Sequence, residues 1–193
     1  VKLKQEGVPG GRMSAALLVW ATSAGATLSE DGVSCDGATL FFSQYQETSP
    51  TSGRENKYYQ IYNPTAAAVN LAADYSIASC INGCSSAAAF EYGYKFAAGA
   101  TIAAGGAYTL CNAGLEDTHG CDEVLSFPRV SYTGNDLLAL IWGTDHTRAR
   151  PADVVDRIGR FTTAREVQQR VPLWTVCGVA SRVVAADVLL TRA

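Results

Sequence analysis

One stretch of the sequence, KYYQIYNPTAAAVNL at residues 57–71, constrains the fold more than any other. Tyr59 and Ile61 fall on one face of an extended chain and their neighbours on the other, which is the pattern of a half-buried β-strand. The Asn-Pro pair that follows ends the strand, because proline has no N–H to donate and restricts the residue before it. Val69 and Leu71 then resume an apolar face, so the stretch predicts a strand, a corner and a restart.

Short β-forming segments recur along the rest of the chain, with glycine, proline and asparagine in the turns between them. We predict further strands in the segments 40–46, 75–80, 91–96, 107–112, 130–143 and 153–161. A helical pattern occurs at 162–171, where a long surface loop fits equally well. Many short strands at regular spacing predict an all-β sandwich rather than a repeat architecture.

The chain has six cysteines, and an even number of cysteines suggests that they pair as disulfide bonds. Disulfides form in oxidising compartments, so the cysteines indicate an exported protein. Two pairs, Cys80–Cys84 and Cys111–Cys121, each flank a short loop with turn residues, and we predict a bond in each. Cys35 is then left to reach Cys177, which would tie the N-terminal leader to the last strands. Six cysteines allow many other pairings, which the sequence leaves open.

The first 26 residues have the pattern of a secretory signal: basic residues, the apolar run MSAALLVWATSA and a small-residue ending, Ala-Gly-Ala. The apolar run is too short to span a bilayer, so we predict no stable membrane span. We divide the chain into a signal at 1–26, a leader at 27–39 and one domain at 40–193, secreted or held at the cell surface. The alternative is that the first segment is a buried helix or strand of the fold.

The sequence lacks the short motifs of common catalytic and nucleotide sites, namely G-x-S-x-G, the P-loop and H-E-x-x-H. His119 lies in an acidic loop and His146 stands between an aspartate and a threonine, so both are interpreted as surface-loop histidines. A Ser/His/Asp set can be drawn around either, but serine and aspartate are abundant enough to make that a chance match. We predict no catalytic residues and no enzyme activity.

A metal site is a more specific alternative to a catalytic site in the same region. Five side chains of types that hold zinc occur there: Cys80, Cys84, Cys111, His119 and Cys121. Their spacing is not that of a common zinc finger, and an oxidising compartment favours disulfides. Four acidic residues offer oxygen ligands for calcium, without the regular EF-hand spacing: Glu116, Asp117, Asp122 and Glu123. We predict disulfides and a solvated acidic loop, with no metal and no cofactor.

Charge is divided unevenly along the chain. Residues 27–145 carry four basic side chains against thirteen acidic ones, whereas residues 146–193 carry eight arginines against four acids. An arginine-rich end can contact phosphate or sulfate groups of a polymer, and four arginines are the candidates: Arg148, Arg150, Arg157 and Arg160. The net charge of the whole chain is −3, so nucleic acid is not the favoured partner.

Six segments in a fixed order carry a family resemblance: LFFSQYQE at 40–47, KYYQIYNPTAAAVNL at 57–71, AAGATIAAGGAYTLCNAG at 97–114, YTGNDLLALIWG at 132–143, DVVDRIGRF at 153–161 and WTVCGVA at 174–180. Together they resemble the lamin tail domain, in particular its secreted microbial and algal branch, over residues 40–192. Two positions depart from that pattern. Gln60 stands where the family usually has Glu, and Asn135 precedes Asp136 where the family commonly has Asp-Asp. A role that depends on the family's carboxylates at positions 60 and 135 is therefore not carried over to this chain.

The resemblance implies an immunoglobulin-like β-sandwich that acts as a binding or interaction module. We expect a non-enzymatic, secreted lamin-tail-domain protein that binds or scaffolds at the cell surface, with a protein or an extracellular polymer as its partner. The alternative is an accessory module that holds a polyanion, either nucleic acid or an anionic polysaccharide, for an extracellular nuclease or hydrolase. The exposed sheet, the loop at 47–56 and the segment at 148–170 are the candidate contact surfaces.

Overall fold

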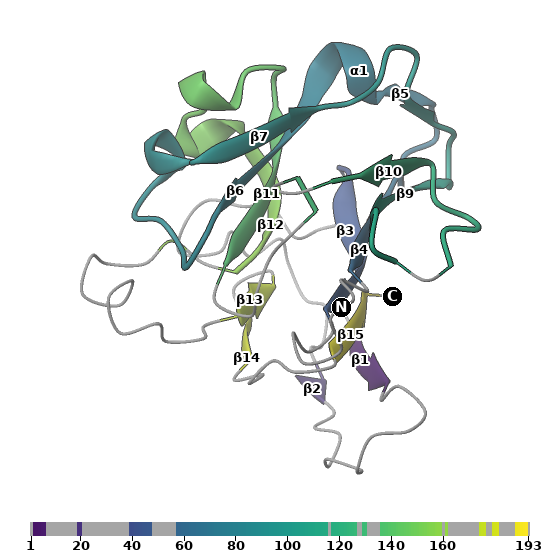
Figure 1. Ribbon diagram of the computed structural model, residues 1–193, viewed down its shortest axis with the longest axis horizontal. Helices are drawn as coiled ribbons and strands as arrows, with labels where there is room; N and C mark the ends of the chain where they lie inside the picture. The colour runs from purple at the N-terminus through teal and green to yellow at the C-terminus, as the bar shows by residue number, and fades with distance from the viewer. Residues whose placement is uncertain are drawn as a thin grey trace.

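The computed structural model gives the chain a mostly β fold (Figure 1). It describes residues 39–47, 57–115, 117–126, 129–130, 136–159 and 161, together with the course of five further strands at Lys2–Glu6, Val19–Trp20, Trp174–Val176, Val179–Ser181 and Val188–Arg192. Within this part the sheets are antiparallel apart from one strand pair, and the one α-helix has four residues. The β-rich class that the sequence predicts is confirmed.

The larger sheet has the strand order β10-β9-β4-β3-β15-β1-β2. In that order the strands span Glu123–Leu125, Ala107–Asn112, Tyr58–Tyr62, Phe41–Glu47, Val188–Arg192, Lys2–Glu6 and Val19–Trp20. β4 pairs with β3 on one side and β9 on the other, so the stretch that most constrains the sequence lies inside the sheet. β10 is the one described strand that runs parallel to its neighbour.

The smaller sheet has the order β12-β11-β6-β7, and its four strands lie side by side in Figure 1. They span Val154–Ile158, Leu137–Trp142, Tyr75–Cys80 and Tyr92–Lys95. Two short pairs complete the described sheets: β5 (Val69–Asn70) with β8 (Thr101–Ile102), and β13 (Trp174–Val176) with β14 (Val179–Ser181). Each strand segment predicted from the sequence corresponds to one of these strands, and the bounds of β6 and β9 coincide with the predicted 75–80 and 107–112. The helical pattern at 162–171 lies outside the described residues.

Two strands come from the segment that the sequence interprets as a secretory signal or, alternatively, as part of the fold. β1 pairs with β15 and with β2 at the edge of the larger sheet. The signal, the leader at 27–39 and the domain bounds stay predictions. None of the helices in the described ranges is long and apolar enough to cross a membrane.

The corner after β4 is built by the side chain of Asn63. β4 alternates as predicted, with Tyr59 and Ile61 fully buried. The Asn63 amide nitrogen donates to the carbonyl oxygens of Ala67, at 2.8 Å, of the last residue of β8 and of the residue after it, while its oxygen accepts from the backbone N–H of Thr65 at 3.0 Å. Asn63 is itself buried, so its hydrogen bonds fix the corner from the inside.

The restart after the corner is shorter than the sequence predicts. Val69 resumes a strand, but Leu71 begins the helix α1 (Leu71–Asp74) instead of continuing β5. The reason is the side chain of Asn70, which accepts from the backbone N–H of Ala73 at 3.1 Å and so caps the helix. Leu71 is still completely buried, as an apolar continuation requires.

An inner core lies between the two sheets, because both contribute side chains to one buried cluster. The larger sheet supplies Phe42, Tyr59, Ile61, Tyr108 and Leu110, and the smaller sheet supplies Tyr75, Ile77, Leu138, Leu140 and Ile158. Aromatic rings meet edge to face within it, as between Phe42 and Tyr59, whose centroids are 5.7 Å apart.

A second cluster, the outer core, covers the opposite face of the smaller sheet. Successive residues of a strand point to opposite faces, so Leu137, Ala139 and Ile141 of β11 turn away from the inner core. They are covered by two segments, 81–90 and 143–153, which we call the outer layer and which contain three short 3-10 helices: η2 (Ala87–Ala89), η3 (His146–Arg148) and η4 (Pro151–Asp153). Small residues such as Ala78, Ala87 and Ala149 make up much of this cluster.

Two of the three predicted disulfides are confirmed. Cys80–Cys84 links the end of β6 to the outer layer, with Cα atoms 5.6 Å apart, and Cys111–Cys121 links β9 to the acidic loop, with Cα atoms 5.9 Å apart. Cys35 and Cys177 lie outside the described residues, so their bond stays a prediction. The four described cysteines are therefore not available as zinc thiolates.

Candidate functional site

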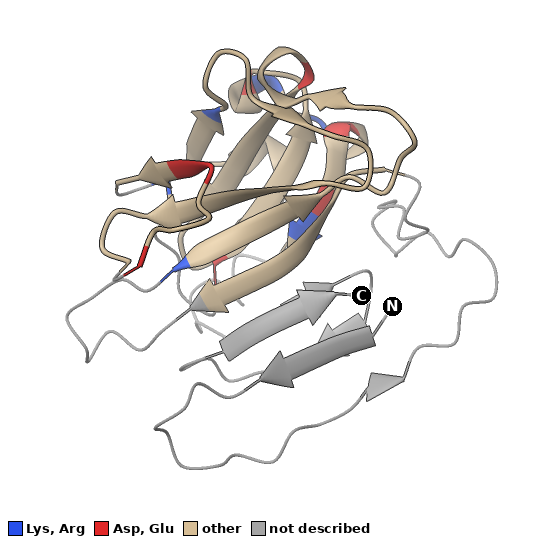
Figure 2. Ribbon diagram, turned by 90° about the vertical axis from the view of Figure 1, so that its right-hand side faces the viewer, with Lys and Arg blue, Asp and Glu red and all other residues tan. Residues whose placement is uncertain are grey.

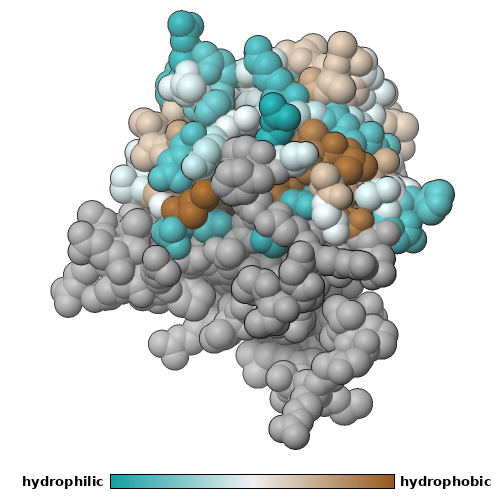
Figure 3. Space-filling model, viewed as in Figure 1, coloured by the Kyte–Doolittle hydropathy of each residue, from teal (hydrophilic) through white to brown (hydrophobic). Residues whose placement is uncertain are grey.

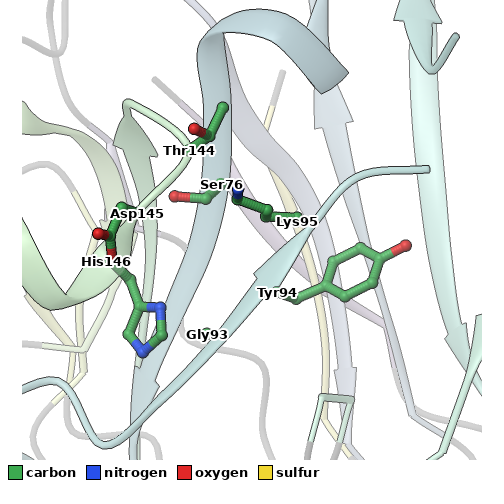
Figure 4. A pocket seen from close by; sticks show the side chains of 7 residues that line it. All are labelled: Ser76, Gly93, Tyr94, Lys95, Thr144, Asp145 and His146. Atoms are coloured by element: carbon green, nitrogen blue, oxygen red, sulfur yellow. The ribbon is translucent and has the colours of Figure 1, made fainter. Parts of the chain in front are cut away.

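A cavity of about 280 Å³ opens between the smaller sheet and the outer layer, and we call it the β7–η3 basin. Its walls come from β6, from β7 and from the turn that joins β11 to η3. Seven residues line it: Ser76, Gly93, Tyr94, Lys95, Thr144, Asp145 and His146. Figure 4 shows the Tyr94 ring pointing away from the other side chains.

The turn on one side of the basin is held by Gly143, whose φ of +116° favours glycine. Its N–H donates to the Asp74 carbonyl oxygen at 2.7 Å, and its own carbonyl oxygen accepts from the Ser76 hydroxyl at 2.6 Å. Both partners belong to the α1–β6 junction or to β6 itself. These two bonds fix the start of the 143–153 segment on the smaller sheet.

Asp145 caps the short helix η3. One oxygen of its carboxylate accepts from the Thr147 hydroxyl at 2.6 Å and from the Thr147 N–H at 3.0 Å, and the other lies 3.5 Å from Nε of Arg148. The hydrogen bonds from Thr147 lower the pKa of Asp145, with a smaller contribution from the Arg148 charge. The one carboxylate that lines the basin is thus already bound to neighbouring residues of its own loop.

His146 packs against the backbone of Gly93 in the middle of β7. A Cβ on residue 93 would overlap the imidazole ring around Nδ1, so the ring occupies the space that any other residue would fill (Figure 4). Glycine inside a strand is often a sign of such a close approach. The partly buried position of His146 therefore depends on the absence of a side chain at Gly93.

Three polar groups in the basin have no hydrogen-bond partner among the described residues. Among the described residues, the Lys95 ammonium group, the His146 imidazole and the Thr144 hydroxyl have no protein hydrogen bond and no ion pair within 4.0 Å. Lys95 is exposed, whereas Thr144 and His146 are partly buried. The basin thus presents two nitrogen groups and a hydroxyl whose hydrogen-bonding capacity is available to a ligand.

Ser76, His146 and Asp145 line one cavity, so a Ser/His/Asp set is brought together here. Catalysis by such a set needs the serine hydroxyl to donate to the histidine and the histidine to donate to the carboxylate. Here the Ser76 hydroxyl donates to a carbonyl oxygen, and the Asp145 carboxylate accepts from Thr147. Ser76 is also 1% exposed, so its hydroxyl is a structural group that holds the turn.

Three of the four arginines that the sequence singles out lie in the described residues, and these three do not form one surface. Arg148 has an 87% exposed side chain beside Asp145, and Arg150, 77% exposed, binds the Asp153 carboxylate through NH2 at 2.8 Å and Nε at 3.0 Å. Arg157 is only 4% exposed and its guanidinium lies 5.0 Å from the ring centre of Phe161. Arg160 lies outside the described residues. Figure 2 shows the described basic residues spread over several strands and loops.

The acidic loop is exposed at Asp117 and Asp122, as the sequence predicts, and partly buried at Glu123. Glu123 accepts from the Tyr108 hydroxyl at 2.6 Å and from the Ala97 N–H at 3.0 Å, and Asp122 accepts from the Thr109 N–H at 2.7 Å. Burial raises the pKa of Glu123, and the hydrogen bond from Ala97 works in the opposite direction. These carboxylates tie the loop to the sheet. His119 is at the surface, as predicted, and Glu116 lies outside the described residues.

Other surface features of the described part give weaker candidates. No group of three or more His, Cys, Asp or Glu side chains is placed there to hold a metal ion. The large hydrophobic side chains exposed there are Val124 and Trp142, and the Trp142 ring packs on Tyr75 with centroids 5.0 Å apart. Figure 3 shows hydrophobic residues in separate groups between hydrophilic ones on one face of the described part. The β7–η3 basin is therefore the candidate site. The loop residues 48–56 lie outside the described ranges.

Comparison of the chain with protein-family models, with curated proteins and with solved structures found no match. The lamin-tail resemblance therefore rests on the sequence segments themselves. Sequence reasoning also missed the basin, because it treated His146 as a histidine on a surface loop. The available signal was Gly93, an isolated glycine between two tyrosines in a predicted strand, which marks a close approach to the backbone.

Proposed function

We propose that the chain is a non-enzymatic binding domain of the lamin-tail type, with an immunoglobulin-like β-sandwich, that is secreted or held at the cell surface. It acts by contact, through the β7–η3 basin and the outer layer around it. Two disulfides in the described part support an oxidising compartment. Two sheets that share one core support the sandwich.

One observation carries the binding role. In the basin, the groups that a hydrolase would need as nucleophile and orienting carboxylate, Ser76 and Asp145, are used to hold the turn and to cap η3. The Lys95 ammonium group and the His146 imidazole, which can hold a ligand by charge and hydrogen bonds, are left without a protein hydrogen bond among the described residues. This division of roles favours a site that holds a ligand over one that converts it.

The polyanion-holding alternative rests on the arginine-rich end of the chain. Of the four candidate arginines, Arg150 is engaged with Asp153 and Arg157 is buried, so neither is disposed to contact a phosphate or sulfate polymer. A long polyanion would also meet a chain of net negative charge. We therefore propose contact with a discrete partner rather than with an extended polyanion.

A co-sedimentation panel tests this function with the full chain, produced in an oxidising host. The targets are cell envelopes of the source organism, duplex DNA, and anionic and neutral polysaccharides at physiological salt. We expect binding to envelopes that weakens only modestly as the salt concentration rises, since a single charged contact is involved. Binding to DNA alone that disappears at high salt would instead support the polyanion alternative. Hydrolytic activity abolished by His146→Ala would overturn the non-enzymatic role.

A further inference from the structure

We propose that the β7–η3 basin binds a single oxyanion group, a carboxylate or a sulfate, carried by a small ligand. The inference rests on the proposed binding function and names the chemistry of the ligand at that site. Lys95 and His146 would hold the oxyanion from two sides of the basin, and the Thr144 hydroxyl would donate to it from the turn.

The charges of the basin favour an anion. Its carboxylate, Asp145, lies beside the Arg148 guanidinium and accepts two hydrogen bonds from Thr147, so its negative charge is already compensated. Among the described residues no carboxylate pairs with Lys95, which contributes a positive charge at the rim. Hydrogen bonds between an ammonium group and a carboxylate or sulfate oxygen are about twice as strong as neutral ones.

The residues that would hold the ligand stand on rigid elements. Lys95 is the last residue of β7, which pairs with β6 from Ser76↔Lys95 to Ser79↔Tyr92. His146 is held in place by its packing against Gly93, and its loop is fixed to β6 through Gly143. The His146 imidazole is therefore preorganised and loses little entropy when a ligand binds, whereas the exposed Lys95 side chain becomes ordered only with the ligand.

The size of the basin limits the ligand. A volume of about 280 Å³ is slightly below the range of pockets that hold drug-sized molecules, so it accommodates one charged group with a short body. The negative net charge of the chain disfavours a longer anion with many charges. A free inorganic anion and the acid group of a single sugar both satisfy this chemistry, and the experiment separates them.

NMR of the two histidine rings in the full chain provides the test, because the chain contains only His119 and His146. His119 is an internal control: it lies in the acidic loop, exposed, and does not line the basin. The probes are sulfate, glucuronate and, as a neutral control, glucose, at one pH and low ionic strength. We expect saturable shifts of the His146 ring with sulfate or glucuronate, none with glucose, and no saturable shift of His119.

Variants assign the effect to the basin. Lys95→Gln is expected to weaken sulfate or glucuronate binding about tenfold, which corresponds to loss of one charge-assisted contact. Arg129→Gln is the matched control, since it also removes one positive charge near β7, where Arg129 lies over the Tyr94 ring at 5.8 Å, but does not line the basin. It is expected to change the dissociation constant less than twofold.

The results identify the class of ligand or overturn the inference. Binding of glucuronate but not sulfate assigns the site to a sugar acid, and binding of both assigns it to any small oxyanion. Equal shifts of both rings, equal effects of glucose and glucuronate, or equal losses in the Lys95→Gln and Arg129→Gln variants would overturn the inference. If neither anion binds while envelope binding persists, the oxyanion site fails and the binding function stands.

Discussion

The inner core and the outer core lie on opposite faces of the same four strands but differ in the side chains that form them. The inner core contains large aliphatic and aromatic side chains from both sheets, such as Tyr59, Ile61 and Leu140. The outer core contains alanines, a disulfide and segments with no strand pairing, which together cover Leu137 and Ile141. The first holds the sheets together, whereas the second carries the turn on which the candidate site stands. The proposed binding site thus depends on the less extensive of the two cores.

The largest expected effect comes from truncating matched leucines on the two faces of β11. Leu140 faces the inner core and Leu137 the outer core, and both are fully buried. We expect Leu140→Ala to cost about 3–5 kcal/mol of unfolding free energy and Leu137→Ala about 2–3 kcal/mol, because the loop-covered site collapses more easily around the cavity. Urea unfolding measures both. A greater loss in Leu137→Ala would reverse the ranking of the two cores.

Removing one disulfide tests how the outer layer is held. Replacement of both Cys80 and Cys84 by serine is expected to cost about 2 kcal/mol, and replacement of Cys111 and Cys121 about 3 kcal/mol because that bond closes a longer loop. Replacement of Cys80 and Cys84 should nevertheless broaden or shift the NMR signal of the His146 ring more than replacement of Cys111 and Cys121, since it frees part of the outer layer. Urea unfolding and NMR check the two effects. An unchanged His146 signal would mean that the outer layer holds its shape without this bond.

A double-mutant cycle tests the contact between Gly93 and His146. Alanine in a strand is normally about 0.5–1 kcal/mol more stable than glycine. Because a Cβ on residue 93 overlaps the imidazole ring, we expect Gly93→Ala to destabilise the wild-type chain by about 1 kcal/mol and to stabilise the His146→Ala variant. Thermal or urea unfolding of the four proteins gives the coupling. The same effect in both backgrounds would show that the ring does not rest on Gly93.

The smallest effect is expected at the surface of the outer layer, where Asp153 binds Arg150 and its backbone N–H. The hydrogen bonds from Arg150 lower the pKa of Asp153 to about 2. A lowered carboxyl pKa stabilises the fold above the ordinary aspartate value of 3.8, and this contribution is lost as the pH falls toward 2. Asp153→Asn should therefore be less stable than wild type at pH 7 and equal to it near pH 2. Thermal unfolding at the two pH values checks this, and a constant difference would contradict it.

The inner core could be predicted from the sequence because it follows a regular alternation. Tyr59 and Ile61 repeat at the strand period of two, and Pro64 marks where pairing must stop, so the position and buried face of β4 could be predicted. The disulfides Cys80–Cys84 and Cys111–Cys121 were also within reach, since each closes a short loop.

The outer layer and the basin could not be predicted in the same way, because their geometry depends on contacts between distant segments. His146 meets Gly93 across more than fifty residues, and Asp145 and Ser76 are used by local hydrogen bonds that composition does not reveal. The side chain of Asn70 likewise decided that Leu71 would start a helix. Polar side chains that bind the backbone override an apolar pattern at such points.

We propose that the domain acts by contact through the β7–η3 basin. This proposal is tested most directly by co-sedimentation of wild type, the double variant Lys95→Gln with His146→Gln, and the Arg129→Gln control with envelopes of the source organism. Circular dichroism and urea unfolding establish that all three proteins are folded. We expect wild type and Arg129→Gln to bind alike and the double variant to lose most of its binding. Equal binding by all three folded proteins would contradict it and would place the contact surface elsewhere.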